Sequence, residues 1–139
     1  DGATEASHDD FRGVPGAFAS ALAGIAAAKR VGLSFQINTT ITRHNVDELP
    51  QMLDLAVELG AAAFNPFLLV PTGRGKDLAD QEISPEQYEQ TLRWLSTHQD
   101  REDILLRVTC APHYQRVLRQ ERAAGNIPAE ASGPGGAEV

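Results

Sequence analysis

The sequence has one cysteine, Cys110, among its 139 residues. A single cysteine excludes an internal disulfide and a cysteine-ligated metal cluster within one chain. No apolar run reaches about 18 residues, so no transmembrane helix is expected, and no signal peptide is recognisable. Lys and Arg number 12 against 19 Asp and Glu, a net charge of −7, which argues against a general nucleic-acid binder. We expect a cytoplasmic protein with no metal site in this chain.

The remaining composition is ordinary for a globular protein, with 42% apolar and 22% charged residues. The length suffices for one domain with a real core, which we place at residues 1–125. Residues 126–139 contain three Gly, two Pro and little to bury. They are therefore expected to form a disordered tail.

Residues 62–76, AAFNPFLLVPTGRGK, are the centre of the predicted fold. A short apolar run bounded by turn residues is typical of a strand buried on both faces, and such strands belong to parallel sheets covered by helices. The loop that follows, residues 70–76, would lie at the edge where α/β folds bind ligands.

Helical and strand patterns alternate along the rest of the chain. Apolar residues three and four apart predict helices, and alternating apolar and polar residues predict the first strand. If that strand lines a barrel, Gln36 and Asn38 point inward. The expected helices cover residues 4–11, 17–30, about 47–59, 84–98 and 112–124, and the expected strands cover residues 33–40, 62–70 and 104–109.

Two helix starts carry capping signals. Ser84 and Gln87 have the spacing of a capping box. The helix before them could be capped by Asn45 or Asp47, and Pro50 favours Asp47, because proline in the first turn costs no hydrogen bond.

Short links and right-handed crossovers make the three strands parallel. Three strands do not close a barrel, which needs about eight, or six in an open version. Two α/β architectures remain: half of a (β/α) TIM-like barrel with covering helices, or a small open sheet. The chain opens on the turn signal Asp1-Gly2 with no strand before it. This favours the half barrel, as a piece of a longer parent protein that continues upstream.

Polar residues at two places could bind a ligand. Asp1 and Arg12 bracket the first loop, where a carboxylate can hold a ribose diol and an arginine can grip a carboxylate; the alternative is a pair of solvated loop charges. Asn38 and Thr39 end the first strand, where barrel ligands bind. Asn38 suits an adenine edge or an amino-acid head group, unless these residues only form a strand-end turn.

Two further motifs follow the later strands. Residues 72–76, TGRGK, lack the pattern of a Walker A loop, but their glycines and Arg74 could present N–H groups and a guanidinium to an anion; the alternative is a flexible connector. Cys110 and His113 stand three residues apart, too few ligands for structural zinc, so buried structural roles are expected for both.

Four segments together resemble the radical S-adenosylmethionine (radical SAM) enzymes. Residues 1–13 resemble the family's S-x-D-G…E…H-D…R-G segment. Residues 38–40, 69–75 and 111–114 resemble its haem and haem d1 biosynthesis branch, whose members carry a C-terminal auxiliary iron–sulfur domain. The resemblance covers about residues 1–120 and implies the C-terminal part of a (β/α)6 barrel.

The resemblance also implies roles for single residues. Asp1 would help to hold the SAM ribose, Arg12 would meet the SAM carboxylate, and Asn38 and Thr39 would line the SAM pocket. The substrate-binding candidates are Arg74, facing an anionic group such as a porphyrin propionate, and His113. No catalytic residue and no metal ligand is expected in this chain.

The resemblance implies an iron–sulfur oxidoreductase as the parent, with SAM and a [4Fe–4S] cluster as cofactors. A reduced cluster would cleave SAM, and the resulting radical would abstract hydrogen from a small-molecule or peptide substrate, in haem or other tetrapyrrole biosynthesis or in peptide maturation. The family's CxxxCxxC and Gly-Gly-Glu segments are absent here, so this chain alone should bind neither cofactor and be inactive. The alternative is a non-catalytic α/β interaction module. Exposed barrel edges would favour a homodimer.

Overall fold

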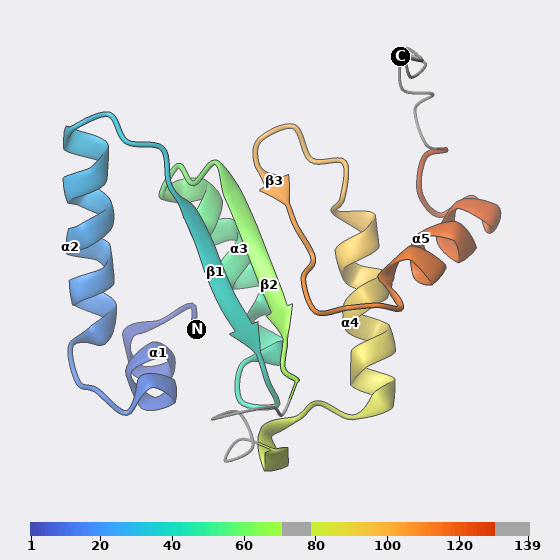
Figure 1. The fold of residues 1–139 in the computed structure, drawn as a ribbon, viewed down its shortest axis with the longest axis horizontal. Coiled ribbons are helices and arrows are strands. Elements are labelled where there is room, and N and C mark those ends of the chain that lie inside the picture. The colour runs from blue at the N-terminus through green and yellow to red at the C-terminus, as the bar shows by residue number, and fades with distance from the viewer. Residues whose placement is uncertain (71–78, 130–139) are drawn as a thin grey trace, which may run out of the picture.

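The computed structural model describes residues 1–70 and 79–129, in which helices and parallel strands alternate (Figure 1). A short 3-10 helix, η1, precedes α3. The elements in chain order are α1 (Glu5–Arg12), α2 (Ala17–Arg30), β1 (Gln36–Ile41), η1 (Val46–Glu48), α3 (Leu49–Glu58), β2 (Ala63–Leu68), α4 (Pro85–Thr97), β3 (Leu105–Leu106) and α5 (Tyr114–Ala123).

The three strands form one sheet in the order β1-β2-β3, and their parallel direction confirms the prediction. The third strand is shorter than the expected residues 104–109, although a bridge between Phe67 and Thr109 continues the pairing. Arg107 and Thr109 still donate backbone hydrogen bonds to Phe64 and Pro66. Pro66 has no N–H to donate in return, so the ladder between β2 and β3 is interrupted.

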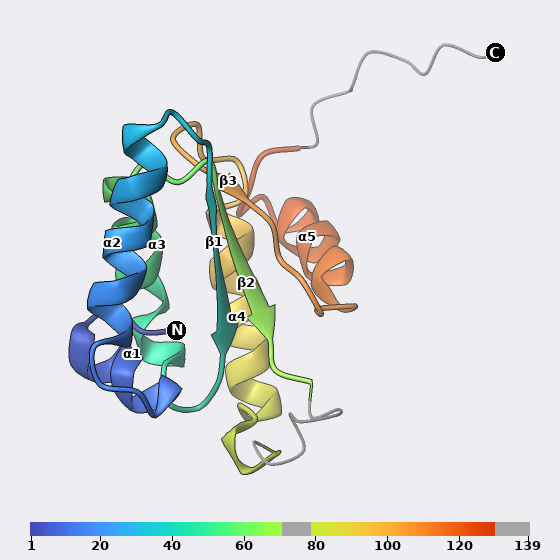
Figure 2. The same ribbon diagram turned by 60° about the vertical axis from the view of Figure 1, so that its left-hand side comes forward.

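Helices α3 and α4 cover one face of the sheet, and this interface holds the core (Figures 1 and 2). Phe64 of β2 is fully buried there, with Ile41 of β1 and Leu106 of β3. The helices contribute mainly aliphatic side chains, spaced three or four residues apart. They are Leu49, Met52, Leu53 and Ala56 of α3 and Leu92 and Leu95 of α4.

The opposite face of the sheet carries no helix from the described residues (Figure 1). Thr39 places its hydroxyl 3.6 Å from the sulfur of Met52 in α3, so its neighbours Asn38 and Thr40 point the other way. Asn65 of β2 pairs with Asn38 in the register and shares its side of the sheet. We call this side the open face.

Helix α2 has the predicted bounds but buries none of its residues among the described parts of the chain. It lies beyond the edge of β1 that pairs with no other strand of the described residues (Figures 1 and 2). Its apolar positions Phe18, Leu22 and Ile25 are only half-buried. The predicted apolar face is therefore present but only partly covered.

The cap predicted at Asp47 is wrong. Residues 46–48 form η1, and α3 begins at Leu49 with Glu48 as its cap residue. Asn45 does not cap α3 either, because its side chain is fully buried and bonded to the backbone of Asp1, Thr40 and Thr42. Proline does lie in the first turn, as expected.

The capping box at α4 is confirmed. The amide of Gln87 donates to Oγ of Ser84 at 3.2 Å, and the amide of Ser84 donates to Oε1 of Gln87 at 3.1 Å. Helix α5 starts at Tyr114, two residues later than expected. It is joined to α4 by ion pairs of Arg116 with Glu89 and of Arg93 with the buried Glu121.

The chain is packed beyond residue 125, where the tail was expected to begin. Gly125 takes the left-handed conformation (φ 76°) and ends α5. The Asn126 side chain then donates to Oε2 of Glu121 at 2.7 Å, and Ile127 packs into the core at 8% exposure. Residues 130–139, the rest of the expected tail, lie outside the described residues.

In the described ranges, no single helix is long and apolar enough to cross a membrane. Helices α1 and α2 meet that test of length and composition only as a pair bent by 107°.

Candidate functional site

The Asp1 carboxylate is fixed at the C-terminal end of β1. Its Oδ1 accepts a hydrogen bond of 2.9 Å from the backbone amide of Thr40, and its Oδ2 lies 3.0 Å from Nε of Arg12. The Asp1 side chain is 7% exposed, whereas that of Arg12 is 58% exposed. The structure thus brings the two predicted residues together as an ion pair, with the guanidinium on the solvent side.

Asn45 and Glu48, neither of which was predicted to belong to a binding site, complete the attachment of Asp1 to β1. Nδ2 of Asn45 donates to the carbonyl oxygens of Asp1 and Thr40, each at 2.8 Å. Glu48 accepts a hydrogen bond of 2.8 Å from the amide of Ala3. The segment before α1 is therefore tied to β1 and to the loop that follows it.

The structure separates Asn38 from Thr39, which were expected to act together. Thr39 is 2% exposed and lies between Met52 and the Asp1 carboxylate, on the helix side of the sheet. Asn38 is exposed on the open face, and its Oδ1 accepts a hydrogen bond of 2.6 Å from Nδ2 of Asn65. Of these two residues, Asn38 is the one placed to contact a ligand on the open face.

His113 and Cys110 line a cavity of about 810 Å³ at the C-terminal ends of β2 and β3. Both residues are exposed, so the expected buried roles are wrong. The segment after β3 turns sharply there, with Cys110 in the left-handed region (φ 57°). Arg43 and Tyr88 also line this cavity, which therefore combines a cation with aromatic surface. Arg74 lies outside the described residues.

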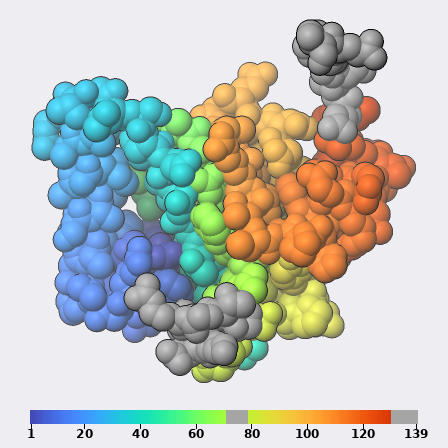
Figure 3. Space-filling view, viewed as in Figure 1, coloured from blue at the N-terminus to red at the C-terminus, as the bar shows by residue number. Residues whose placement is uncertain are grey.

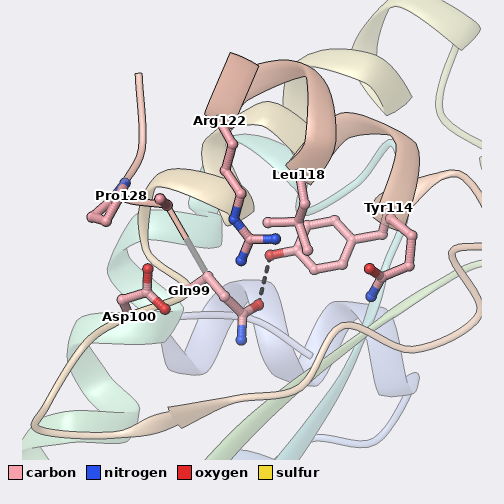
Figure 4. Close-up of a pocket in the computed structure, with 8 residues that line it drawn as sticks. Gln99, Asp100, Tyr114, Leu118, Arg122 and Pro128 are labelled. Carbon is pink, nitrogen blue, oxygen red and sulfur yellow. Dashed lines mark hydrogen bonds between the residues drawn. The ribbon is translucent and has the colours of Figure 1, made fainter. Parts of the chain in front are cut away.

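A second cavity, of about 600 Å³, lies between α5, the segment after it and the connection from α4 to β3 (Figure 4). The hydroxyl of Tyr114 donates to Oε1 of Gln99 at 2.7 Å across it. Burial raises the pKa of Tyr114 well above its ordinary value, so the phenol stays neutral. This contact fastens the α4–β3 connection to α5, which is a structural role.

The described residues contain no group of three or more His, Cys, Asp or Glu side chains that could hold a metal ion. They therefore offer no ligand set for an iron–sulfur cluster, whose irons are bound chiefly by thiolates.

Asp9 fixes the start of α2 through its carboxylate. Its oxygens accept hydrogen bonds from the amides of Phe18 at 2.8 Å and Gly16 at 2.5 Å. These bonds, that from Phe18 above all, hold the pKa of Asp9 below its ordinary value. A depressed folded-state pKa means that the stabilisation is complete above the unfolded pKa of about 4 and is lost as pH falls through the folded-state pKa.

We therefore expect the amide proton resonances of Gly16 and Phe18 to titrate with a midpoint below about pH 4. An NMR titration between about pH 2 and 6 measures this midpoint. Asp9→Asn should abolish the titration, and Asp10→Asn, a change at the neighbouring residue of α1, should leave it intact. Persistence of the titration in Asp9→Asn would assign it to another group.

These features define a parallel α/β sheet with covering helices, a polar open face and ligand-sized space at the C-terminal ends of its strands. No family model matches the chain, and no solved structure matches it. Curated proteins do match. The chain is 48% identical to an AdoMet-dependent heme synthase of Methanosarcina barkeri over 121 residues, which are 87% of this chain and 34% of the relative.

Two further relatives agree. An AdoMet-dependent heme synthase of Nitratidesulfovibrio vulgaris is 48% identical over 86% of this chain and 33% of the relative. A pre-heme d1 synthase of Dinoroseobacter shibae is 43% identical over 50% of this chain and 17% of the relative. The chain belongs to the radical SAM family, to which these homologues belong, and the resemblance seen in the sequence is confirmed. It spans about a third of the length of the heme synthases that it matches.

Proposed function

We propose that this chain is the part of a radical SAM oxidoreductase that lines the SAM and substrate pocket, in tetrapyrrole biosynthesis or peptide maturation. The observation that carries the proposal is the 48% identity to AdoMet-dependent heme synthases over most of this chain. In this proposal residues 1–125 are the C-terminal half of a (β/α)6 barrel. The open face of the sheet is its interior.

SAM fits the residues on the open face. Oδ1 of Asn65 is buried and has no hydrogen-bond partner in the part of the chain that the structure describes. The exposed Asn38 amide stands beside it. An adenosyl or amino-acid group carries the N–H and O–H donors that such an acceptor lacks. Arg12 is not on this face but is paired with Asp1 at the C-terminal end of β1 and is more than half exposed. There it can pair with the SAM carboxylate, and Asp1 acts by holding Arg12 in place.

SAM supplies, on reductive cleavage, the species that abstracts hydrogen from the substrate. In this proposal the cysteines that bind the [4Fe–4S] cluster lie in the remaining two thirds of the parent, because this chain has a single cysteine. The cavity lined by His113 and Arg43 takes part of the substrate, and Arg74 remains a proposed contact for an anionic group.

One observation favours the alternative, a non-catalytic interaction module. Helix α2 presents apolar residues that the described chain covers only in part. In the half-barrel proposal this surface and the unpaired edge of β1 receive a strand that precedes Asp1. In the alternative they receive a partner protein, or a second copy of the chain.

The deciding experiment uses the full-length polypeptide encoded by the reading frame, purified without oxygen. We expect about four irons per cluster bound, SAM binding by equilibrium dialysis, and 5′-deoxyadenosine released on reduction with dithionite. The 139-residue chain alone should show none of the three. A full-length protein without iron or SAM binding would contradict the proposal and favour the interaction module.

A further inference from the structure

Asn65 is an unusual residue for the middle of this sheet. It is 5% exposed, although it lies on the open face beside Asn38 of β1. Its Nδ2 donates to Oδ1 of Asn38 at 2.6 Å, a short hydrogen bond for two neutral amides. We call these two residues the amide pair.

The other polar atom of Asn65 is unsatisfied. Its Oδ1 is buried and has no hydrogen-bond partner among residues 1–70 and 79–129. Turning both amides over exchanges donor and acceptor between them and still leaves one buried polar atom of Asn65 unpaired. A buried polar group without a partner is costly and is rare in native proteins, so its presence on the open face points to a group that completes it.

We propose that the amide pair is a recognition unit in which both amides contact the ligand and Asn65 also orients Asn38. Asn65 fixes the orientation of the exposed Asn38 amide and leaves Oδ1 to accept a hydrogen bond from a ligand. Asn38 in turn offers its NH₂ group to a ligand acceptor. The unit therefore suits a group with a donor and an acceptor side by side, as on the edge of adenine. The inference rests on the proposed function in taking the ligand to be the adenosyl part of SAM.

The proposal predicts opposite effects on stability and on binding. Asn65→Leu replaces the buried amide with an apolar side chain of similar size, and so removes the unsatisfied atom from the ligand-free protein. Its melting temperature should equal or exceed that of the wild type, whereas its affinity for the adenosyl group should fall. An asparagine needed only for folding would lower the melting temperature when replaced and leave the affinity of the folded fraction unchanged.

The test uses the full-length protein and S-adenosylhomocysteine, which binds without being cleaved. Calorimetry measures its Kd and differential scanning fluorimetry the melting temperature. We expect Asn65→Leu to raise the Kd at least about tenfold. Asn38→Ala should also raise the Kd, and its melting temperature should fall because the buried Nδ2 of Asn65 loses its acceptor. The matched control is Gln36→Ala, exposed on the same face two residues before Asn38, and it should match the wild type in both.

Competition of adenosine or methionine with S-adenosylhomocysteine shows which part of the ligand the amide pair contacts. Adenosine should bind more weakly to Asn65→Leu than to the wild type, and methionine equally to both. A wild-type Kd in either Asn65→Leu or Asn38→Ala, or a defect for methionine alone, would overturn the inference. If Asn65→Leu does not fold, Asn38→Ala decides. Absence of binding by the wild type itself would instead overturn the proposed function.

Discussion

Phe64→Ala should lower the free energy of unfolding by about 3–5 kcal/mol, the usual cost of truncating a buried aromatic residue. Phe64 is 0% exposed and belongs to the core cluster between the sheet and helices α3 and α4. Domains of this size are stable by only about 5–15 kcal/mol. The substitution should therefore remove a large share of the free energy of unfolding.

Urea denaturation followed by far-ultraviolet circular dichroism measures this loss. Leu105→Ala is the matched control, because Leu105 lies on neighbouring β3 and is 48% exposed. It should change the free energy of unfolding by no more than about 0.5 kcal/mol. Equal effects of the two substitutions would mean that the helix-covered face of the sheet is not the main core.

Local signals predicted the helices well because they act within a few residues. Thr4 caps α1 by accepting a hydrogen bond from the amide of Ser7 at 3.2 Å. The capping box at Ser84 depends only on residues 84–87. The strand order was also predictable, since short links and right-handed crossovers leave few alternatives.

Features that depend on distant partners could not be predicted in this way. Asn45 resembled a helix cap, but its side chain bonds the carbonyl of Asp1, 44 residues earlier in the chain. The early end of β3 depends on Pro66, in the neighbouring strand, whose missing N–H cannot be inferred from the sequence of β3 itself. In both cases the controlling contact joins segments that only the folded chain brings together.

The placement of Asn38 and Thr39 on opposite faces of the sheet could have been predicted from the sequence. Leu33, Phe35 and Ile37 mark the apolar set of the strand, and continuing this alternation assigns Thr39 to the same set. The structure agrees, with Thr39 buried against Met52. Position at a strand end suggested a common role for the two residues, and alternation, the more basic rule, separates them.

The contacts of Asp1 and Arg12 in the structure can be compared with the roles that the family resemblance implies for them. The resemblance implied direct contacts of both residues with SAM, yet both carboxylate oxygens of Asp1 are bonded within the chain. A residue that holds β1, α1 and the exposed guanidinium in register would still shape a ligand site at this edge of the sheet. The segment that carries Asp1 is therefore the place where a small distortion should have the greatest effect on binding.

Gly2→Ala should produce such a distortion. Gly2 is buried, and a Cβ built on it would lie 2.5 Å from the backbone nitrogen of His8 and 2.7 Å from Oγ of Ser7. The carbonyl carbon of Ser7 would be 2.8 Å away. Because two of these atoms belong to the backbone of α1, rotation of a side chain cannot relieve the clash. The helix must move relative to β1, at a cost of about 1–3 kcal/mol, as is typical of an overpacked site.

Gly24→Ala provides a control with the opposite expected effect on stability. Gly24 lies in the interior of α2 with open space around its Cα, and alanine there should stabilise the helix by about 0.5–1 kcal/mol. Amide hydrogen exchange at Thr40 reports on the Asp1 contact directly, since the Thr40 amide donates to the Asp1 carboxylate. Gly2→Ala should lower both the melting temperature and the protection of the Thr40 amide from exchange. In the full-length protein it should also weaken SAM binding. Gly24→Ala should leave both the protection of this amide and SAM binding unchanged. Wild-type protection of Thr40 in Gly2→Ala would show that the segment before α1 can shift without loosening its hold on β1.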